Sequence, residues 1–461
     1  ADGGTGDGTT DGTTPTTPTA TAAAIGLGTD VVMVKSDDSN WATITATVLD
    51  ASSAVIEGIF VTFSASCDPL SASCGTLSAS LVKTNADGKA DRPRVSGSAG
   101  LYVHVPFCLT RCGYCDFNAY ADLGHLRPRY LEALLSEAQM STDRSDATID
   151  SVFLGGGTPT MLEASDLVDL LDGLRSRLPI AADAEVSIEA NPDTVDADSL
   201  KVLREAGYTR LSMGAQSFDA KVLESLERIH QPESVRRAFA DARTAGYDDV
   251  NLDLIYGAQG ESLEDWRATL AETVALRPEH ISAYALTVES NTPLGRQVAA
   301  GQRREPDGDA QADMFELACG VFADAGYEHY EVSNCALPGR ECRHNLNYWH
   351  RGAYLGLGAG AHSHRDPRRW WNLRAPEAYL RAVESGQPPV GGQEELGAEE
   401  IRTEEFFLRL RTREGVPTDW VSPEQASPFE AEGLLVMRNG TYALTERGMF
   451  LANELVLALA G

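Results

Sequence analysis

The sequence is poor in the features that mark several broad classes of protein. It has only 8 cysteines in 461 residues, which argues against a disulfide-stapled scaffold. It contains no run of about 18 consecutive apolar residues, so we predict no membrane-spanning helix. Positive charge is scarce, because 38 Lys and Arg stand against 68 Asp and Glu and give a formal net charge of -30. A chain this acidic repels phosphate backbones, which argues against nucleic acid as a partner.

What is present is typical of a globular protein of several domains. The chain is 43% hydrophobic and 23% charged, which is enough apolar material to fill real cores, and its length predicts two to four domains. The first part differs, since residues 1–22 contain only small and polar side chains and Pro, with no large apolar residue before Ile25. Such a segment cannot bury enough surface to offset its ordering entropy, and we predict a disordered tail.

Residues 23–90 show the alternation of half-buried β-strands. Ile44, Ala46 and Val48 alternate with threonines, and IFVTFSAS continues the pattern. This segment resembles a bacterial Ig-like repeat of the invasin and intimin type, but it breaks off at DRPRVSGSAG, where further strands would follow. We therefore predict an all-β, Ig-like segment that is incomplete. Cys67 and Cys74 could pair across a loop or both stay unpaired.

From Leu101 onward, apolar strands alternate with amphipathic helices. The strand-like stretches are SVFLGGG, EVSIEA, RLSMGAQ, DVNLDLIYG and HISAYALTV. Repeated β-α units predict an α/β fold with a parallel sheet, either open or closed into a barrel. Polar residues stand where these strands end, at Gly155 to Thr158, Glu189, Gln216 and Asp253. Ligands bind at the carboxyl ends of such strands, so we expect a site there.

The last segment reads as a small unit of its own. EEFFLRLRTREG is helical in pattern, and the text from Gly433 predicts a strand, an Asn-Gly turn, a strand and a helix. This layout is winged-helix-like. Many winged helices bind DNA, but the acidic charge of the chain favours a lid or docking role here.

Three cysteines lie together at Cys108, Cys112 and Cys115 in the pattern Cys-x3-Cys-x2-Cys. Arg111 and Asp116 make this a polar loop, which argues against inert core thiols. Soft thiolates bind zinc, copper(I) or iron–sulfur clusters. A structural zinc site needs a closed tetrahedron, and no second cysteine pair follows. We therefore favour a cluster held by three cysteines, with one iron left open for a ligand, while zinc remains the alternative.

The cysteine motif resembles that of the radical S-adenosylmethionine (SAM) superfamily. The wider text YVHVPFCLTRCGYCDF, FLGGGTPTML, IEANPDT, SMGAQSFD, RIH, NLDLIYG and HNLNYW, over roughly residues 93–461, resembles the branch that contains coproporphyrinogen dehydrogenases and heme chaperones. The resemblance implies a partial (β/α)6 barrel similar to a TIM barrel, with a C-terminal winged-helix-like domain. It also implies that the three cysteines hold a [4Fe-4S] cluster, whose open iron chelates SAM for reductive cleavage.

The resemblance also assigns residues to SAM binding. Glycines let the backbone approach the SAM amino group, Glu189 would accept ribose hydroxyls, and Arg228 would bind the SAM carboxylate. Each assignment has an alternative. Glu189 could be an ordinary surface carboxylate, and Arg228 could form an ion pair on a helix surface. Gln216 and Asp253 could cap the helices that follow them, and Tyr102 could be an ordinary strand tyrosine. The residues that the resemblance assigns to SAM are Tyr102, Gly156, Gly157, Thr158, Glu189, Gln216, Arg228 and Asp253.

Two features select the heme chaperone family, HemW, within this branch. The dehydrogenases typically carry a further cysteine where this chain has Phe117, and HNxxYW is typical of HemW. The resemblance implies a heme site at His344, Asn345, Tyr348 and Trp349.

The heme site has its own alternatives. His344 would be the axial ligand, since neutral imidazole is a common one, and Arg340 and Arg343 would meet the propionates. A hydrogen-bonded structural role for His344 stays open, as does Cys342 as the ligand. We interpret His362 and His364 as part of a Gly-rich turn near the site.

The domain division follows from these assignments. We predict a tail at 1–22, the Ig-like segment at 23–90, the radical SAM core at 91–300, a barrel extension with HNLNYW at 301–390 and the winged-helix-like domain at 391–461.

The leading hypothesis is a heme chaperone that delivers heme to acceptor haemoproteins, with [4Fe-4S], SAM and heme as cofactors. An oxygen-independent coproporphyrinogen III oxidase is the enzymatic alternative, and a surface adhesion or spacer protein is the third. Whether the protein is an enzyme therefore stays open, as does a dimer. We expect a cytoplasmic location, with peripheral contact at the inner face of the membrane as a further option.

Overall fold

A computed structural model of the chain describes residues 98–141 and 147–460, together with the backbone of four short strands before them. The chain divides into two compact units, Ala1–Ser96 and Gly97–Gly461. In the first unit β1 pairs antiparallel with β2, and β3 with β4. These strands are β1 (Val31–Lys35), β2 (Thr45–Leu49), β3 (Phe60–Val61) and β4 (Val82–Lys83). The expected tail and the two cysteines of this unit lie outside the described residues.

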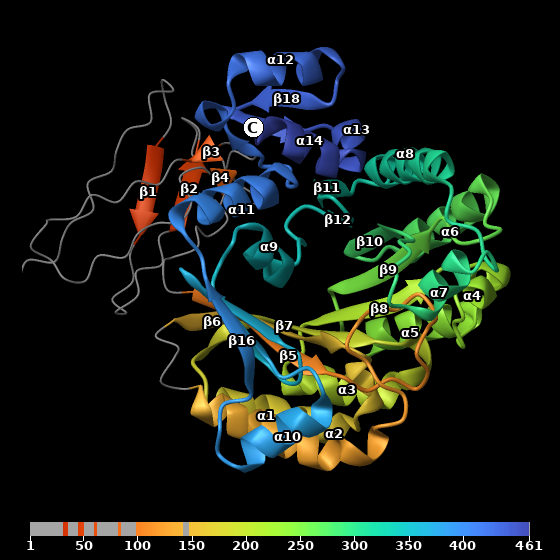
Figure 1. The fold of residues 1–461 in the computed structure, drawn as a ribbon, viewed down its shortest axis with the longest axis vertical. Coiled ribbons are helices and arrows are strands. Elements are labelled where there is room, and N and C mark those ends of the chain that lie inside the picture. The colour runs from red at the N-terminus through yellow and green to blue at the C-terminus, as the bar shows by residue number, and fades with distance from the viewer. Residues whose placement is uncertain are drawn as a thin grey trace, which may run out of the picture. The chain divides into compact units, whose positions relative to one another are not determined.

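The second unit is built on one large sheet whose middle strands are all parallel (Figure 1). Neighbouring strands in the order β10-β9-β8-β7-β6-β5 also follow one another along the chain, as expected for successive β-α units. The strands are β5 (Ser98–Val105), β6 (Thr148–Gly156), β7 (Ile180–Ala190), β8 (Arg210–Gln216), β9 (Val250–Tyr256) and β10 (His280–Ala285). The predicted α/β fold is confirmed, and the curved parallel sheet fits a partial barrel.

Helices follow these strands and cover the outside of the sheet, as in α1 to α3 beneath it in Figure 1. The apolar residues of these helices recur with the spacing that buries one helix face. In α2, for example, buried leucines recur at 167, 170, 171 and 174. Each such side chain contributes about 1.5–3 kcal/mol on burial. The helices are α1 (Arg127–Met140), α2 (Ala164–Arg175), α3 (Ala197–Ala206), α4 (Ala220–Ser225), α5 (Pro232–Thr244) and α6 (Leu263–Leu276).

The two faces of the barrel strands have different side chains. On β5, Leu101, Val103 and Val105 are buried in the main apolar core. The residues between them face the interior of the barrel, since a Cβ added at Gly100 would touch the ring of His344. The period of two therefore separates a core face from an interior face that is free to carry polar groups.

The segment after β10 adds strands to both edges of the parallel sheet. On one edge β12 pairs antiparallel with β10, while on the other β13 pairs parallel with β5, so α9 comes to lie between the two edges (Figure 1). The strands are β11 (Glu328–Glu331), β12 (Asn334–Ala336), β13 (Tyr354–Leu357), β14 (His362–Arg365), β15 (Arg368–Asn372) and β16 (Val390–Glu395). The helices are α7 (Pro293–Ala299), α8 (Gly308–Asp324), α9 (Arg343–Trp349) and α10 (Pro376–Glu384).

The C-terminal part forms a small antiparallel sheet, β17-β19-β18, with helices around it. Asn439 and Gly440 join β18 to β19 with positive φ angles of 52° and 81°, which confirms the predicted Asn-Gly turn. The elements are α11 (Ala398–Leu410), β17 (Val416–Pro417), α12 (Pro423–Ala431), β18 (Leu435–Arg438), β19 (Thr441–Leu444), α13 (Glu446–Phe450) and α14 (Ala452–Leu459). None of the helices in the described part of the chain is both long and apolar enough to cross a membrane.

Candidate functional site

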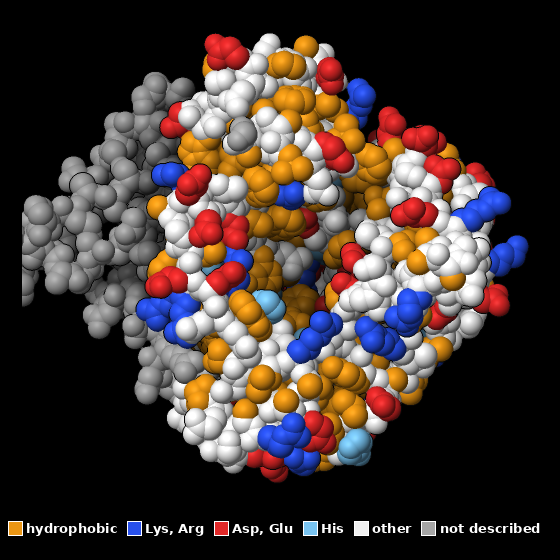
Figure 2. All heavy atoms as spheres, viewed as in Figure 1, with side chains coloured by type: hydrophobic (Ala, Val, Ile, Leu, Met, Phe, Trp, Pro, Cys, Tyr) orange, Lys and Arg blue, Asp and Glu red, His pale blue; other side chains and the backbone are white. Residues whose placement is uncertain are grey.

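A cavity of about 380 Å³ lies at the carboxyl ends of the parallel strands. Figure 2 shows that the molecule is hollowed near the centre of this view, with hydrophobic side chains in the wall. The cavity is lined by the cysteine loop on one side and by the ends of β6 to β10 on the other. It brings together most of the residues assigned to the cluster and to SAM, namely Cys108, Cys112, Cys115, Gly156, Gly157, Thr158, Glu189, Gln216, Arg228 and Asp253.

Backbone hydrogen bonds fix the cysteine loop at its base. The Cys108 N–H donates to the carbonyl of Tyr120 (3.0 Å), and the Tyr120 N–H donates to the carbonyl of Pro106 (2.8 Å). Within the loop, the Cys115 N–H donates to the carbonyl of Cys112 (3.1 Å). The loop therefore leaves β5 and returns to it at a closed neck, with the three thiols on the segment between.

The thiols have polar neighbours. Thr158 Oγ1 lies 3.8 Å from Cys108 Sγ, and Arg228 Nη1 donates to Cys112 Sγ at 3.4 Å. Burial raises the pKa of Cys108 to about 11 and also raises the pKa of Cys115. Three cysteine side chains on one loop that lines a cavity are a donor set that suits an iron–sulfur cluster.

The GGGTP turn binds the end of β6 to the end of β5. The Gly157 N–H donates to the Val105 carbonyl (2.9 Å), and the Thr158 N–H donates to the Phe107 carbonyl (2.7 Å). Gly156 has φ +111°, and a Cβ there would collide with the ring of His104. Only glycine satisfies both demands, so this turn can bring bare backbone to the cavity wall.

Two carboxylates, Glu189 and Asp253, line the cavity. Glu189 Oε2 accepts a hydrogen bond from the Gly156 N–H (3.0 Å), and Asp253 accepts from Ser212 Oγ (3.1 Å) and from Asn251 Nδ2 (2.8 Å). Burial and the nearby Asp253 charge raise the pKa of Glu189 to about 8, although the Gly156 N–H opposes the shift. Burial also raises the pKa of Asp253. Such acids suit a ligand that brings hydroxyl or ammonium donors.

Arg228 lines the cavity and brings a positive charge to it. Its Nη2 donates to the Gly214 carbonyl (3.1 Å), while its Nε is buried and has no hydrogen-bond partner among the described residues. Gln216, at the end of β8, has φ +63°, which is uncommon for a residue other than glycine. The positive charge of Arg228 suits a carboxylate and the two acids suit hydrogen-bond donors, so the cavity suits a ligand that has both kinds of group, as SAM does.

Tyr102 is not part of the cavity wall. Its hydroxyl is 2.9 Å from His104 Nδ1, and its ring stacks against Phe153 with 6.4 Å between centroids. Conversely, sequence reasoning missed two residues of the wall, Ser212 and Tyr284. The period of two could have found both, because Ser212 stands four residues before Gln216 on β8 and Tyr284 stands on the interior face of β10.

The HNLNYW segment lies at the opposite end of the barrel from the cavity. It forms α9, whose N-terminus is held by the carboxylate of Glu185 on β7. That carboxylate accepts from the backbone N–H groups of Arg343 (3.2 Å) and His344 (3.3 Å), and the Cys342 thiol donates to it (3.5 Å). Glu185 lies in the middle of β7, whereas Glu189 lies near its carboxyl end and lines the cavity, so α9 packs against the part of the strand that is farther from the cavity.

His344 is buried and hydrogen-bonded at both ring nitrogens. Nδ1 is 3.1 Å from Ser151 Oγ and Nε2 is 2.9 Å from Tyr348 Oη. Its ring also stacks on Phe153, and only 1% of the residue is exposed. This geometry is that of the structural histidine that the sequence left open, because neither nitrogen can reach an iron without losing a bond. Asn345 and Trp349 are half-buried.

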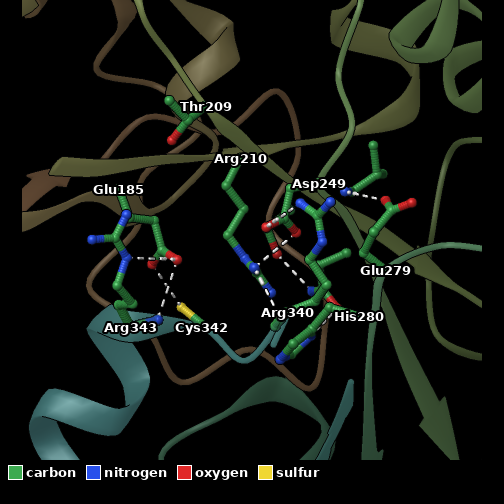
Figure 3. A network of polar contacts seen from close by, with 12 residues as sticks. Glu185, Thr209, Arg210, Asp249, Glu279, His280, Arg340, Cys342 and Arg343 are labelled. Atoms are coloured by element: carbon green, nitrogen blue, oxygen red, sulfur yellow. Dashed lines mark hydrogen bonds and ion pairs between the residues drawn. The ribbon is translucent and has the colours of Figure 1, made fainter. Parts of the chain in front are cut away.

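Figure 3 shows a network of charges beside α9. Arg210 is almost fully buried and donates to Asp249 (2.8 Å) and to the Arg340 carbonyl (3.2 Å). Arg340 lies 4.0 Å from Asp249, and Arg343 lies 3.9 Å from Glu185. Both arginines that were expected to meet heme propionates therefore have carboxylates of the protein beside them.

The second pair of histidines lies on β14, away from the cavity wall. His364 is buried, with Nδ1 3.2 Å from the Gly352 carbonyl and Nε2 3.2 Å from Asp366. His362 is exposed. The expected Gly-rich turn precedes them, but the two side chains themselves belong to the strand.

The fold and the three-cysteine cavity define a protein of the radical SAM class. The model of the Radical SAM superfamily matches residues 102–272. A solved structure of coproporphyrinogen III oxidase from Escherichia coli, described as a radical SAM enzyme, matches with TM-score 0.69 and 22% identity over 79% of this chain and 90% of that chain, which shows the shared fold. A [4Fe-4S] cluster and SAM are cofactors of this class, and the cavity has the residues to hold them.

Curated relatives identify the family. A heme chaperone HemW from Mycobacterium tuberculosis is 44% identical over 369 residues, which are 78% of this chain and 95% of that protein. The heme chaperone HemW of Escherichia coli is 37% identical over 77% of this chain and 96% of its own length. A mouse mitochondrial protein named radical S-adenosyl methionine domain-containing protein 1 is 37% identical over 79% of this chain and 88% of its length. The chain therefore belongs to the HemW family.

Proposed function

We propose that this protein is a heme chaperone that binds heme and delivers it to acceptor haemoproteins. The observation that carries the proposal is the alignment with relatives named heme chaperone over 95% and 96% of their length, at 44% and 37% identity. A likeness that spans nearly the whole relative includes both ends of the barrel and not the cluster motif alone.

The cavity has a defined role within this function. Cys108, Cys112 and Cys115 would hold the cluster, Arg228 would bind the SAM carboxylate, and Glu189 would accept the ribose hydroxyls. When bound, the cluster supplies one-electron chemistry and an open iron for SAM. The backbone of the GGGTP turn would position the amino group. In a chaperone this site regulates or supports heme transfer.

The enzymatic alternative, coproporphyrinogen III oxidase, is not favoured. The solved oxidase shares the fold at 22% identity, and this supports no statement on activity. Phe117 is 61% exposed in the cavity wall, where the dehydrogenase branch that the sequence resembles carries a cysteine. An adhesion or spacer role is not favoured either, because it would rest on the Ig-like segment alone.

Further parts of the proposal concern the other segments. Asn345, Tyr348 and Trp349 would contribute to a heme-binding surface around α9, whose partial exposure leaves room for contact. The C-terminal unit would be a winged-helix-like docking domain, supported by the β18–β19 hairpin and its flanking helices. We also propose that residues 23–90 form an incomplete Ig-like segment. The protein would be cytoplasmic, with peripheral contact at the inner face of the membrane, and would form a dimer.

The test is an anaerobic titration of the cluster-reconstituted full chain with hemin, followed by transfer to the apo form of a b-type haemoprotein. A saturable Soret change and transfer of heme would support the chaperone. Without saturable binding the proposal falls, and turnover of coproporphyrinogen with SAM and a reductant would then establish the oxidase instead.

A further inference from the structure

Heme binding, as proposed above, requires a ligand for the iron, and the expected one is engaged elsewhere. Both ring nitrogens of His344 have hydrogen-bond partners inside the barrel, and the residue is 1% exposed. His364 is likewise buried and hydrogen-bonded at both nitrogens. A histidine that ligates heme iron must instead present a free nitrogen on an accessible face.

His362 meets both requirements. It is exposed, and among the described residues neither of its ring nitrogens has a hydrogen-bond or ion-pair partner. Its ring stacks against Trp371 of the neighbouring strand, with 5.7 Å between centroids and 27° between planes. The imidazole is therefore held by packing while its nitrogens stay open.

The surroundings form an aromatic platform across three strands. His362 on β14 pairs with Trp371 on β15, which pairs with Gly392 on β16. A Cβ at Gly392 would collide with the indole of Trp371, so the absence of a side chain there lets the indole lie against the sheet. The indole thus holds the imidazole from the side, and an apolar ring edge beside an open imidazole suits an edge-to-face contact with a porphyrin.

The platform continues toward the HNLNYW helix. Two residues beyond His362, on the same face of β14, the ring of His364 lies 5.9 Å from that of Tyr354. Tyr354 in turn lies 4.7 Å from Tyr348 of α9, between ring centroids. The motif that marks the family therefore borders the surface on which His362 stands, and its tyrosine forms part of the same aromatic row.

The charge state of His362 also suits a ligand. Partial burial and the guanidinium of Arg369 lower the pKa of His362, although Glu394 opposes them. Arg369 itself pairs with Glu394 (3.1 Å) and with Glu404, and Glu404 also pairs with Arg351 (2.9 Å), so each of these charges has a partner beside the imidazole. A neutral imidazole is the form that binds metal.

We infer that His362 would supply the imidazole ligand of the heme iron, and that Trp371, stacked on that imidazole, would meet the macrocycle with the edge of its indole. This inference rests on the proposed function and assigns its heme site to the platform of His362, Trp371 and Gly392, with α9 as the border. His344 then has the separate role of fixing α9 to the barrel.

The experiment compares histidine variants of the cluster-reconstituted full chain by anaerobic hemin titration and by the Soret and electron paramagnetic resonance spectra. We expect His362→Ala to weaken heme binding by about tenfold or more and to change the spectrum of the residual complex. Added imidazole should restore the wild-type spectrum, because it fills the vacated position. His362→Met should bind heme with a different spectrum, since a thioether replaces the imidazole.

Matched controls separate the outcomes. His125→Ala removes another exposed histidine and should bind heme as the wild type does. Trp371→Phe should keep most of the affinity, whereas Trp371→Ala should lower it. Wild-type affinity and spectrum in His362→Ala would overturn the inference while leaving the chaperone intact. Absence of saturable binding in the wild type itself would instead overturn the proposed function.

Discussion

The two ends of the barrel are built from the same strands but on opposite principles. At the carboxyl ends, Glu189 and Asp253 have raised pKa values and no ion-pair partner among the described residues. At the amino ends, Arg210 is paired with Asp249, and Glu185 holds the N-terminus of α9, although Nη2 of Arg210 has no hydrogen-bond partner in the described part of the chain. One end leaves its carboxylates unpaired for a ligand, and the other pairs its charges within the protein.

This difference teaches which end stabilises the fold. Buried groups without partners cost free energy until a ligand binds, whereas paired groups resist unfolding only while both partners remain. We therefore expect substitutions at the open end to change cofactor binding with little loss of stability, and substitutions at the closed end to do the reverse.

The largest effect should come from the cysteine loop. Cys112→Ala removes one of three thiolate ligands, so we expect near-complete loss of the cluster, because two thiolates cannot hold it. Iron and sulfide content and the cluster absorbance measure this. Cys319→Ala, a buried cysteine outside the loop, is the control and should keep its cluster. A Cys112→Ala protein with full iron content would remove this loop from the site.

The next effect should come from the closed end. Arg210→Met leaves Asp249 buried with only Arg340 nearby at 4.0 Å, and we expect a loss of about 3–5 kcal/mol in the free energy of unfolding. Urea unfolding monitored by tryptophan fluorescence measures it. Combining Arg210→Met with Asp249→Leu should recover much of the loss, because the buried unpaired carboxylate is then removed and Arg340, which loses its partner, is 42% exposed to solvent. A loss below about 1 kcal/mol in the single variant would contradict a stabilising network.

A smaller and pH-dependent effect should come from Glu189. Below about pH 4.5 its carboxyl is protonated in the folded and the unfolded chain, so it does not affect stability. Between about pH 4.5 and 8 the unfolded chain releases the proton while the folded protein keeps it, so stability falls as pH rises. Glu189→Gln lacks this cost, and we expect it to be more stable than the wild type at pH 8 by on the order of 1–2 kcal/mol.

Unfolding of the cofactor-free protein at several pH values measures that difference. It should vanish near pH 4.5, and SAM should bind the variant more weakly. Glu432→Gln, an exposed position, is the matched control. A constant difference across pH would show that Glu189 is not the group responsible.

The smallest effect should come from the outer helices, away from both ends. Arg236 makes exposed ion pairs with Glu233 (3.1 Å) and Glu272 (2.9 Å). Such pairs are screened by solvent, so Arg236→Ala should cost about 0.5 kcal/mol or less in urea unfolding. A loss comparable to that of Arg210→Met would mean that exposure does not separate the two classes of ion pair.

The open end was far more predictable from the sequence than the closed end. The strands β6 to β10 have local apolar patterns, and parallel strands bring their carboxyl ends together, so Glu189, Gln216 and Asp253 could be placed at one site. The closed end depends on pairings between distant segments, such as Tyr354 with Gly100 across β13 and β5, which leave no local signal. For the same reason the sequence could not decide between heme ligation and a structural role for His344, which the structure places inside the barrel with both ring nitrogens hydrogen-bonded.

The neck of the cysteine loop has a consequence for cluster assembly. Backbone bonds join Cys108 to Tyr120 and Tyr120 to Pro106, so the bonds that close the loop use no cysteine side chain. Closing a loop costs conformational entropy, and here main-chain hydrogen bonds offset part of that cost. The three thiols therefore stay available to ligands, because closure of the loop does not depend on them.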